Sequence, residues 1–464
     1  MKFSKSIILS LSTALTLTVP CIANATNGYF LIGFGAKSRS MGGTGIAVNN
    51  GAMAAASNPA TMIESGTRLD LGAEFFIPPR AITHNSGILG YTDERSNHDL
   101  FLIPSMGGTY EWDKKTTVGF AFIGAGLKTE YNQTAGSDSC QKVNSGAVPG
   151  YSTCPPTVYN PVLANQPSTE AGVELMQMQF IPSIAYKVHK NHTFGASLVL
   201  AAQYFRAEGL SAFEDLGFTV TQGNMTDMGW EHAFGGGYRL GWLGSFVDDK
   251  LKLGANYSSK VWMGKFERYE NLFAEQGDFD IPENYGIGLA YSFTPEWTVA
   301  FDVNRINYSG VRSVANPGPA VDSPTTGNLF PLCPGADKSS CLLGGANGLG
   351  FGWGDQTIYK LGVDWLINEK WNVRAGWNYA ESPIKEDQIL FNMIAPATPE
   401  HHLTFGGGYK FTENIVLDAN VMIAFLNTIK GPTPFGPGGA QVEGSNASIA
   451  MGQYSLGATL GMKF

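Results

Sequence analysis

The sequence predicts an all-β protein: a transmembrane antiparallel β-barrel of about fourteen strands. Three observations support this prediction, namely an alternating C-terminal strand, an N-terminal export signal without a later apolar helix, and a regular succession of short turns and long loops. In hydrocarbon, only helices and closed barrels satisfy their own backbone polar groups. An exported chain without apolar helices of about 20 residues therefore fits a barrel in the outer membrane of a Gram-negative bacterium.

The last strand carries the clearest pattern. Between Tyr454 and Phe464, large apolar residues occupy the even positions and small or polar residues the odd ones. We expect Leu456 to face lipid, and Ser455 and Thr459 to face a polar lumen. The terminal Phe464 is expected to present the chain to the barrel assembly machinery. An edge strand of a soluble β-sandwich is the alternative for this segment.

The N-terminus reads as a signal peptide, assigned to residues 1–25. Lys2 and Lys5 precede an apolar run, and Ala23-Asn24-Ala25 supplies the small residues that signal peptidase requires. Cys21 raises lipidation as an alternative, but Thr18-Val19-Pro20 before it is a poor lipobox. The mature chain is divided into residues 26–67, rich in glycine and alanine, and a barrel over 68–464.

Composition excludes several classes. The chain contains 58 glycines and 12% aromatic residues, as tapered strands with aromatic girdles require. Its net charge of −9 argues against nucleic-acid binding.

Two local cysteine pairs, Cys140 with Cys154 and Cys333 with Cys341, suggest loop disulfides in an oxidising compartment. No Cys-x-x-Cys spacing or histidine partner accompanies them, so no metal site is expected. No cofactor is expected either.

The strand count follows from the connections. Six short polar links are Glu111 to Lys115, Val188 to His192, Ser245 to Lys250, Thr294 to Glu296, Ile367 to Lys370 and Phe411 to Asn414. Seven longer connections lie near 81–97, 131–172, 209–226, 266–281, 313–352, 382–400 and 430–446. Thirteen connections join fourteen strands, with short turns toward the periplasm and long loops outside.

The lumen is expected to have two sectors. Later strands alternate apolar with polar residues, such as Asp302, Lys360, Asp364, Arg374 and Asp418, which indicates a wet wall. In earlier strands, if Phe101 faces lipid, the side chains that face the lumen are apolar. A channel for a hydrophobic solute would need such a surface. The residues predicted to line this apolar sector are Leu100, Leu102, Ile123, Val199 and Phe205. Packing against a plug is the alternative role for them.

Backbone breakers lie in the same sector. Pro104 interrupts the second strand, Pro182 the fourth, and Gly124-Ala125-Gly126 the third. Proline cannot donate to a strand ladder, and glycine inside a strand often marks a bulge. This pattern favours a side opening around the third strand, with a harmless bulge as the alternative.

The segment before the barrel resembles a known family. It combines an aromatic start at Tyr29, a glycine block from Ala36 to Ala47, and the motif Asn58-Pro59-Ala60. With the signal peptide and the terminal aromatic, this order resembles the FadL family of outer-membrane long-chain fatty acid transporters, which includes TodX-like hydrocarbon channels. The resemblance extends over the whole chain in architecture, but only over residues 26–67 in motif detail.

The resemblance implies a fourteen-stranded barrel whose lumen is blocked by the N-terminal segment, hereafter the hatch. It implies passive transport, in which extracellular loops capture a hydrophobic molecule, the hatch lines a pocket, and the molecule leaves sideways at the third strand. Asn58, Pro59 and Ala60 would hold the hatch's fold, and Gly124, Ala125 and Gly126 would form the kink of the exit. The hatch residues implied to contact ligand are Tyr29, Phe30, Leu31, Ile32 and Phe34.

The sequence is compatible with two classes of substrate. Fatty acids and aromatic or alkane hydrocarbons are both compatible, because apolar pockets discriminate methylenes poorly. A carboxylate could be bound by Arg374, Lys360 or Arg206, although a solvated charge network is the alternative for these cations. The expected partners are hydrophobic small molecules, outer-membrane lipid and lipopolysaccharide.

Two other functional classes are alternatives for this sequence. One is a general porin or surface receptor, and the other is an enzyme using Glu400-His401-His402 or His98-Asp99. These histidines lack a nucleophile in a recognisable motif, and the pair at 401 and 402 is expected to have a surface role. No enzymatic activity is predicted.

Overall fold

The computed structural model describes residues 27–86, 90–132, 170–215, 217–319, 333, 339–432 and 446–464. The expected signal peptide and the cysteine pair Cys140 and Cys154 lie outside these residues. None of the helices in the described part of the chain is long and apolar enough to cross a membrane.

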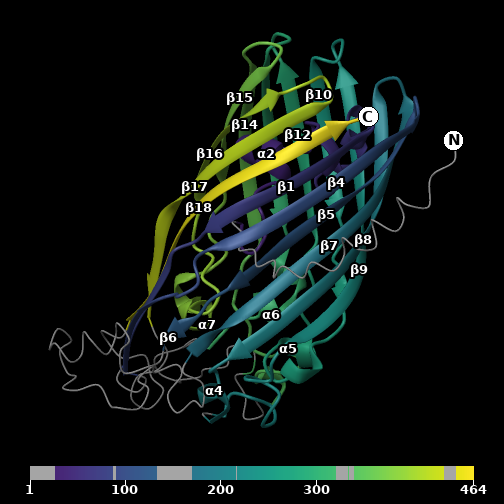
Figure 1. Cartoon of the computed structure of the whole chain (residues 1–464). Helices are drawn as coiled ribbons and strands as arrows, with labels where there is room; N and C mark the ends of the chain where they lie inside the picture. Colours follow the sequence, from purple (N-terminus) through teal and green to yellow (C-terminus); the bar gives the residue numbers. More distant parts are fainter. Residues whose placement is uncertain are drawn as a thin grey trace, which may run out of the picture.

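One closed antiparallel sheet forms the wall (Figure 1). Its fourteen strands are β1 (Arg68–Ile77), β4 (Phe101–Asp113), β5 (Thr116–Lys128), β7 (Glu170–His189), β8 (His192–Glu208), β9 (Glu231–Phe246), β10 (Leu251–Ser258), β12 (Asn284–Ser292), β13 (Trp297–Ile306), β14 (Gln356–Leu366), β15 (Trp371–Tyr379), β16 (His401–Lys410), β17 (Ile415–Gly431) and β18 (Asn446–Lys463). Each pairs with the next in this order, and β1 also pairs with β18, so the sheet closes. The predicted barrel and its strand count are confirmed.

Four short strands extend this wall at the end with the long loops. They are β2 (Arg80–Ser86), β3 (Gly90–Arg95), β6 (Tyr131–Asn132) and β11 (Trp262–Met263). β2 pairs with β18 and β3, while β6 pairs with β7. β11 pairs with β9, so these short strands extend the sheet beside β7, β9 and β18.

The alternation predicted for the last strand is present. Leu456 is 57% exposed on the outer face, whereas Ser455 and Thr459 are buried in the lumen. Large exposed aromatic residues stand near the short turns, as a membrane-interface girdle requires. Among them, Trp297 and Trp365 stack at 5.0 Å.

The hatch lies across the lumen. Its helices are α2 (Gly35–Ser40) and two 3₁₀ helices, η2 (Gly51–Ala56) and η3 (Pro59–Glu64). α2 packs against β15 to β18, η2 against β1, β4 and β5, and η3 against β7, β8 and β9. Contacts with opposite sides of a closed wall place this segment inside the barrel.

Glycines in the wall allow the hatch backbone to approach closely. A Cβ atom at Gly376 would collide with the backbone of Met41 and Gly42, and one at Gly254 with that of Ile46. Hydrogen bonds then hold the hatch in place. Asp302 Oδ2 accepts the N–H groups of Gly45 at 2.7 Å and Ile46 at 3.1 Å.

The long connections form a cap of short helices at one end of the barrel, the lower end in Figure 1. These helices are α4 (Ala212–Asp215), η4 (Glu267–Tyr269), α5 (Ala274–Gly277), η5 (Tyr308–Gly310), α6 (Arg312–Ala315), η6 (Ser339–Cys341), η7 (Glu386–Gln388) and α7 (Ile389–Asn392). In outer-membrane barrels the long loops are extracellular.

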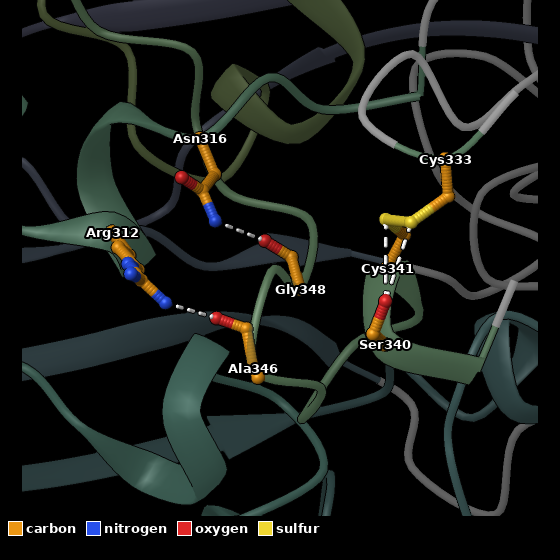
Figure 2. The surroundings of a disulfide bond; sticks show 7 residues. All are labelled: Arg312, Asn316, Cys333, Ser340, Cys341, Ala346 and Gly348. Carbon is orange, nitrogen blue, oxygen red and sulfur yellow. Dashed lines mark hydrogen bonds between the residues drawn. A yellow bond between two sulfur atoms is a disulfide. The ribbon is translucent and has the colours of Figure 1, made fainter.

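A disulfide joins Cys333 to Cys341 in this cap (Figure 2). It confirms one of the two predicted pairs. Nearby, Arg312 donates to the carbonyl of Ala346 and Asn316 to that of Gly348, each at 2.7 Å. The bond and these contacts fix the loop segment that follows Cys341.

Candidate functional site

A central cavity of about 80 Å³ lies between the hatch and the wall, and we call it the hatch cavity. Four of the five hatch residues expected to contact ligand line it: Tyr29, Phe30, Leu31 and Phe34. Ile32 instead packs in a separate cluster with Phe76, Phe101, Ile103 and Met422. From β5, Ile123 and Ala125 line the cavity, as expected for the former.

The N-terminal end of the hatch is a tight turn beneath the loops. Asn27 and Phe30 exchange two backbone hydrogen bonds of 3.0 Å. Gly28 has φ +63°, a left-handed conformation that glycine adopts without strain. The turn presents the Tyr29 ring to Phe279 and Trp353, with centroids 6.2 and 5.9 Å away.

Polar groups also line the hatch cavity. They come from several strands and include Gln177, Gln179, Arg239, Asn256, Asp302 and Lys360. Lys360 donates to the hatch carbonyls of Ile32 at 2.9 Å and Gly43 at 3.3 Å. Arg239 donates to the carbonyls of Ala55 and Ala56. The cavity therefore holds two cations that also anchor the hatch.

A second, apolar cavity of about 50 Å³ lies among the extracellular loops, and we call it the loop pocket. Phe205 lines it, as predicted for the apolar sector. Its other walls include Leu343 and Leu349 from the segment fixed beside the disulfide. Ser313 contributes the one hydroxyl among the lining side chains, so the pocket suits a hydrocarbon group.

The two cavities are neighbours. Phe279 lines the loop pocket and touches the ring of Tyr29, which lines the hatch cavity. Along the inner face of β5, Leu127 belongs to the loop pocket, whereas Ala125 and Ile123 belong to the hatch cavity. One face of β5 thus joins the two cavities.

The strand ladder is interrupted beside this face. Pairing between β4 and β5 ends at Ser105 and Ile123. Beyond it, residues 124–128 pair with β7, and residues 101–104 pair with β1. Contact across the two edges returns where the Asn97 N–H donates to the Glu130 carbonyl, at 2.8 Å. We call this interruption the wall break.

Proline and glycine explain the wall break. Pro104, at the edge of β4, has no N–H to donate. On the opposite edge, a Cβ atom at Gly124 would have only the Gln177 carbonyl oxygen within 4 Å, at 3.9 Å. Near the second proline, the ladder between β7 and β8 omits Ile181 and Pro182. The predicted disruption around the third strand is present in this pairing.

The faces predicted for β4 were wrong. Phe101 and Ile103 are 3% and 2% exposed and point inward, whereas Leu100 is 60% exposed and Leu102 shares its face. All four residues from Leu100 to Ile103 are apolar, so the alternation of apolar and polar residues cannot tell which two of them face the lumen. Val199 does point inward, but it is 1% exposed within the apolar core and lines neither cavity.

The hatch motif makes structural contacts. Asn58 Oδ1 accepts the Ala60 N–H at 3.0 Å, and Pro59 occupies the first turn of η3. The Asn58 amide donates to the carbonyls of Ile46 and, on β9, Trp242. These contacts fit the expected role of holding the hatch's fold.

Two of the three candidate carboxylate-binding cations belong to ion-pair networks. Arg374 pairs with Asp418 at 2.7 Å, and Arg206 pairs with Glu174 at 2.9 Å. Because Phe205 points inward, the alternation of the strand places its neighbour Arg206 on the outer face, away from both cavities. Arg239 was missed, although a cation within an alternating strand is a signal of function.

The structure also places the histidine considered for catalysis. His402 is fully buried on the inner face of β16, so the surface position expected for it was wrong. Within the described ranges, no group of three or more His, Cys, Asp or Glu residues is arranged to hold a metal ion.

A closed barrel crossed by its own N-terminal segment, with an apolar pocket among its loops, defines an outer-membrane transport protein for hydrophobic molecules. Comparison assigns the family. Residues 163–430, more than half of the chain, match the family described as outer membrane protein transport protein (OMPP1/FadL/TodX). The chain belongs to this family, whose members are transport channels and not enzymes. Its location is the outer membrane of a Gram-negative bacterium.

Solved structures share the fold. The Pseudomonas putida toluene transporter TodX matches with a TM-score of 0.64 at 19% identity, the Ralstonia pickettii toluene transporter TbuX with 0.58 at 18%, and a Pseudomonas aeruginosa FadL homologue with 0.62 at 13%. Each match covers 93% of this chain and 99% of the other.

One curated relative also matches. It is an uncharacterized protein of Chlorobium limicola, encoded in the 5′ region of a phosphoenolpyruvate carboxykinase gene, 41% identical over 81 residues. That match spans 17% of this chain and 39% of the relative's length.

Proposed function

We propose that the protein carries long-chain fatty acids into the outer membrane by passive diffusion. The loop pocket captures the apolar chain, the hatch cavity receives the molecule, and the wall break releases it sideways. The observation that carries this proposal is the continuous inner face of β5, on which Leu127, Ala125 and Ile123 link both cavities to the wall break.

The energetics require no coupled energy source. Each buried CH₂ gains about 0.8 kcal/mol, so a fatty acid leaves water for the loop pocket. Lipopolysaccharide would hinder direct entry into the bilayer, and a shielded route avoids it. Consumption of the substrate inside the cell then maintains the gradient.

Fatty acids are favoured over hydrocarbons because of the polar wall of the hatch cavity. Arg239 and Lys360 place two cations beside the hatch residues. A carboxylate gains charge-assisted hydrogen bonds there, which toluene cannot form. The hydrocarbon alternative is supported by the apolar lining of the loop pocket and by the fold shared with toluene transporters.

Uptake measurements test the route and the substrate. Cells lacking their own fatty acid channel, and expressing this protein, should take up labelled oleate; uptake of labelled toluene alone would favour the hydrocarbon alternative. A Gly124→Phe substitution should cover the wall break, and so reduce uptake while leaving oleate binding to the purified protein intact.

Gly236→Phe provides the matched control. A Cβ atom at Gly236 has only the Val199 carbonyl within 4 Å, at 3.8 Å, but this glycine lies on β9, away from the wall break. Equal uptake by wild-type and Gly124→Phe proteins, both inserted and folded, would reject sideways release.

A further inference from the structure

Arg80 is a buried arginine at the loop end of the wall break. It begins β2, directly after Pro78-Pro79, and is 3% exposed. Its Nη1 donates to the carbonyl oxygen of Lys128, and its Nη2 to that of His98. These two carbonyls lie on opposite sides of the break, so Arg80 bridges its edges.

Within the part of the chain that the structure describes, the Asp99 carboxylate acts on the charge of Arg80 only from beyond contact distance. No carboxylate there forms an ion pair with it, and its Nε–H is buried without a hydrogen-bond partner. The guanidinium lies 5.7 Å from the centre of the Phe101 ring. Carbonyl groups satisfy two of its hydrogen bonds, but a buried charge remains costly until an anion approaches it.

Three other arginines in the wall and hatch differ in this respect. Arg39 pairs with Glu74, Arg206 with Glu174 and Glu208, and Arg374 with Asp364 and Asp418. These cations are neutralised by neighbouring carboxylates. Arg239 is closer to Arg80, because it also donates to two backbone carbonyls and its Nε–H is also buried without a hydrogen-bond partner. The carbonyls that it binds belong to the hatch, whereas those that Arg80 binds belong to the two edges of the wall break.

The surroundings of Arg80 suit an amphipathic ligand. Arg80 lines a small cavity of about 20 Å³ together with Tyr29 and Leu127. The Tyr29 hydroxyl is also buried without a hydrogen-bond partner. A cation and a hydroxyl donor thus border one cavity, next to the apolar face of β5.

We propose that Arg80 binds the carboxylate of the transported molecule at the wall break, with the Tyr29 hydroxyl as a second donor. This inference rests on the proposed function and deepens it, because it assigns the side chains that bind the fatty acid's carboxylate at the wall break. A guanidinium has five N–H donors, so Arg80 can offer Nε–H to an anion while keeping both carbonyls. The apolar chain would then lie along Leu127.

The test compares a charged and an uncharged ligand of equal chain length. Purified full-length protein in non-ionic detergent is titrated with labelled oleate and with labelled methyl oleate. In Arg80→Met, oleate affinity should fall about tenfold, the loss of one charge-assisted hydrogen bond, while methyl oleate affinity stays unchanged. Arg80→Lys should recover part of the oleate affinity.

Arg305→Met is the matched control, because Arg305 pairs with Asp355 at 3.1 Å elsewhere in the wall. It should change neither affinity. An equal loss for both ligands in Arg80→Met would show a structural role and overturn the proposal, as would unchanged oleate binding. Heat-modifiable migration in gels checks that each variant folds.

The wild-type protein supplies a measurement that does not depend on a variant. It should bind oleate more tightly than methyl oleate, and this preference should vanish once the pH falls below the ligand's carboxyl pKa. Equal binding of both ligands at neutral pH would overturn the role of Arg80, together with the preference for fatty acids over hydrocarbons, but not the transport of hydrophobic molecules. Binding of neither would overturn the proposed function as well.

Discussion

Tyr308 donates a hydrogen bond of 2.8 Å to the carbonyl oxygen of Asn27. The contact joins an extracellular connection, just after β13, to the first described residue of the hatch. Tyr308 also packs against Tyr29, with ring centroids 5.7 Å apart. The loops and the N-terminal turn of the hatch therefore form one packed unit.

Gly28→Ala should disrupt this unit. A Cβ atom at Gly28 would overlap the Tyr308 side chain and would also be strained at φ +63°. We expect weaker oleate binding to the purified protein. Gly66→Ala is the control, because Gly66 has φ +68° but no atom within 4 Å of its Cβ position. Its cost should be backbone strain alone, about 1 kcal/mol. Similar oleate affinities for the two variants would contradict the proposed contact.

Asp302→Ala should loosen the hatch. The substitution leaves the N–H groups of Gly45 and Ile46 without their acceptor, at a cost of about 1–3 kcal/mol for each buried unsatisfied group. The expected results are a lower unfolding temperature in detergent and a higher ion conductance in planar bilayers. Asp302→Asn keeps an acceptor oxygen, so its unfolding temperature and conductance should lie between those of the wild-type protein and Asp302→Ala. A conductance equal to that of Asp302→Ala would argue against the hydrogen bonds as the cause.

Removing the disulfide should act on the loop pocket and spare the barrel. In the chain-entropy model, a loop of this length contributes about 2–3 kcal/mol. We expect Cys333→Ser/Cys341→Ser to bind oleate less tightly, because Leu343 and Leu349 lose their restraint, while the main unfolding transition stays in place. Reducing agent should reproduce the effect in the wild-type protein and leave the double variant unchanged.

The loop that carries Phe279 should respond to pH. Burial, followed by repulsion from Asp280 and Glu275, raises the pKa of Asp278 from 3.8 to about 6. Because the pKa of Asp278 is higher in the packed loop than in the unfolded chain, its protonated form stabilises the packed loop. This stabilisation is complete below the unfolded pKa of about 4 and is lost as the pH rises through 6.

Hydrogen exchange can measure this response at the paired amides of Val261 and Ile281. Corrected for intrinsic exchange rates, protection should decrease between pH 4 and pH 7. Asp278→Asn should flatten the profile. A decrease of the same size in the variant would assign the pH dependence to another group.

The fold could be predicted because its signals are local and repeated. The alternation around Leu456 and the spacing of short turns each follow from the two-residue period of a strand. Pro104 and Gly124 marked the wall break for the same reason, since each residue alone limits strand pairing.

The site was less predictable because it depends on contacts distant in sequence. No local pattern brings Arg80 to the carbonyl of Lys128, or Phe279 to Tyr29. The run Leu100 to Ile103 lacks alternation, so its faces depend on pairing with β1. The position of Arg239, a cation within an alternating strand, was visible in the sequence. Its hydrogen bonds to hatch carbonyls could not be predicted, because they form only in the folded barrel.

The pairing of β1 with β18 has a consequence for biogenesis. The seam of the barrel joins the first wall strand to the last, so it cannot close until the whole chain has been translocated. The hatch precedes β1, and its backbone packs closely against the wall at Gly254 and Gly376, where even an added Cβ atom would collide with it. We therefore expect the hatch to be enclosed by a sheet that is still open, with closure of the seam as the final step.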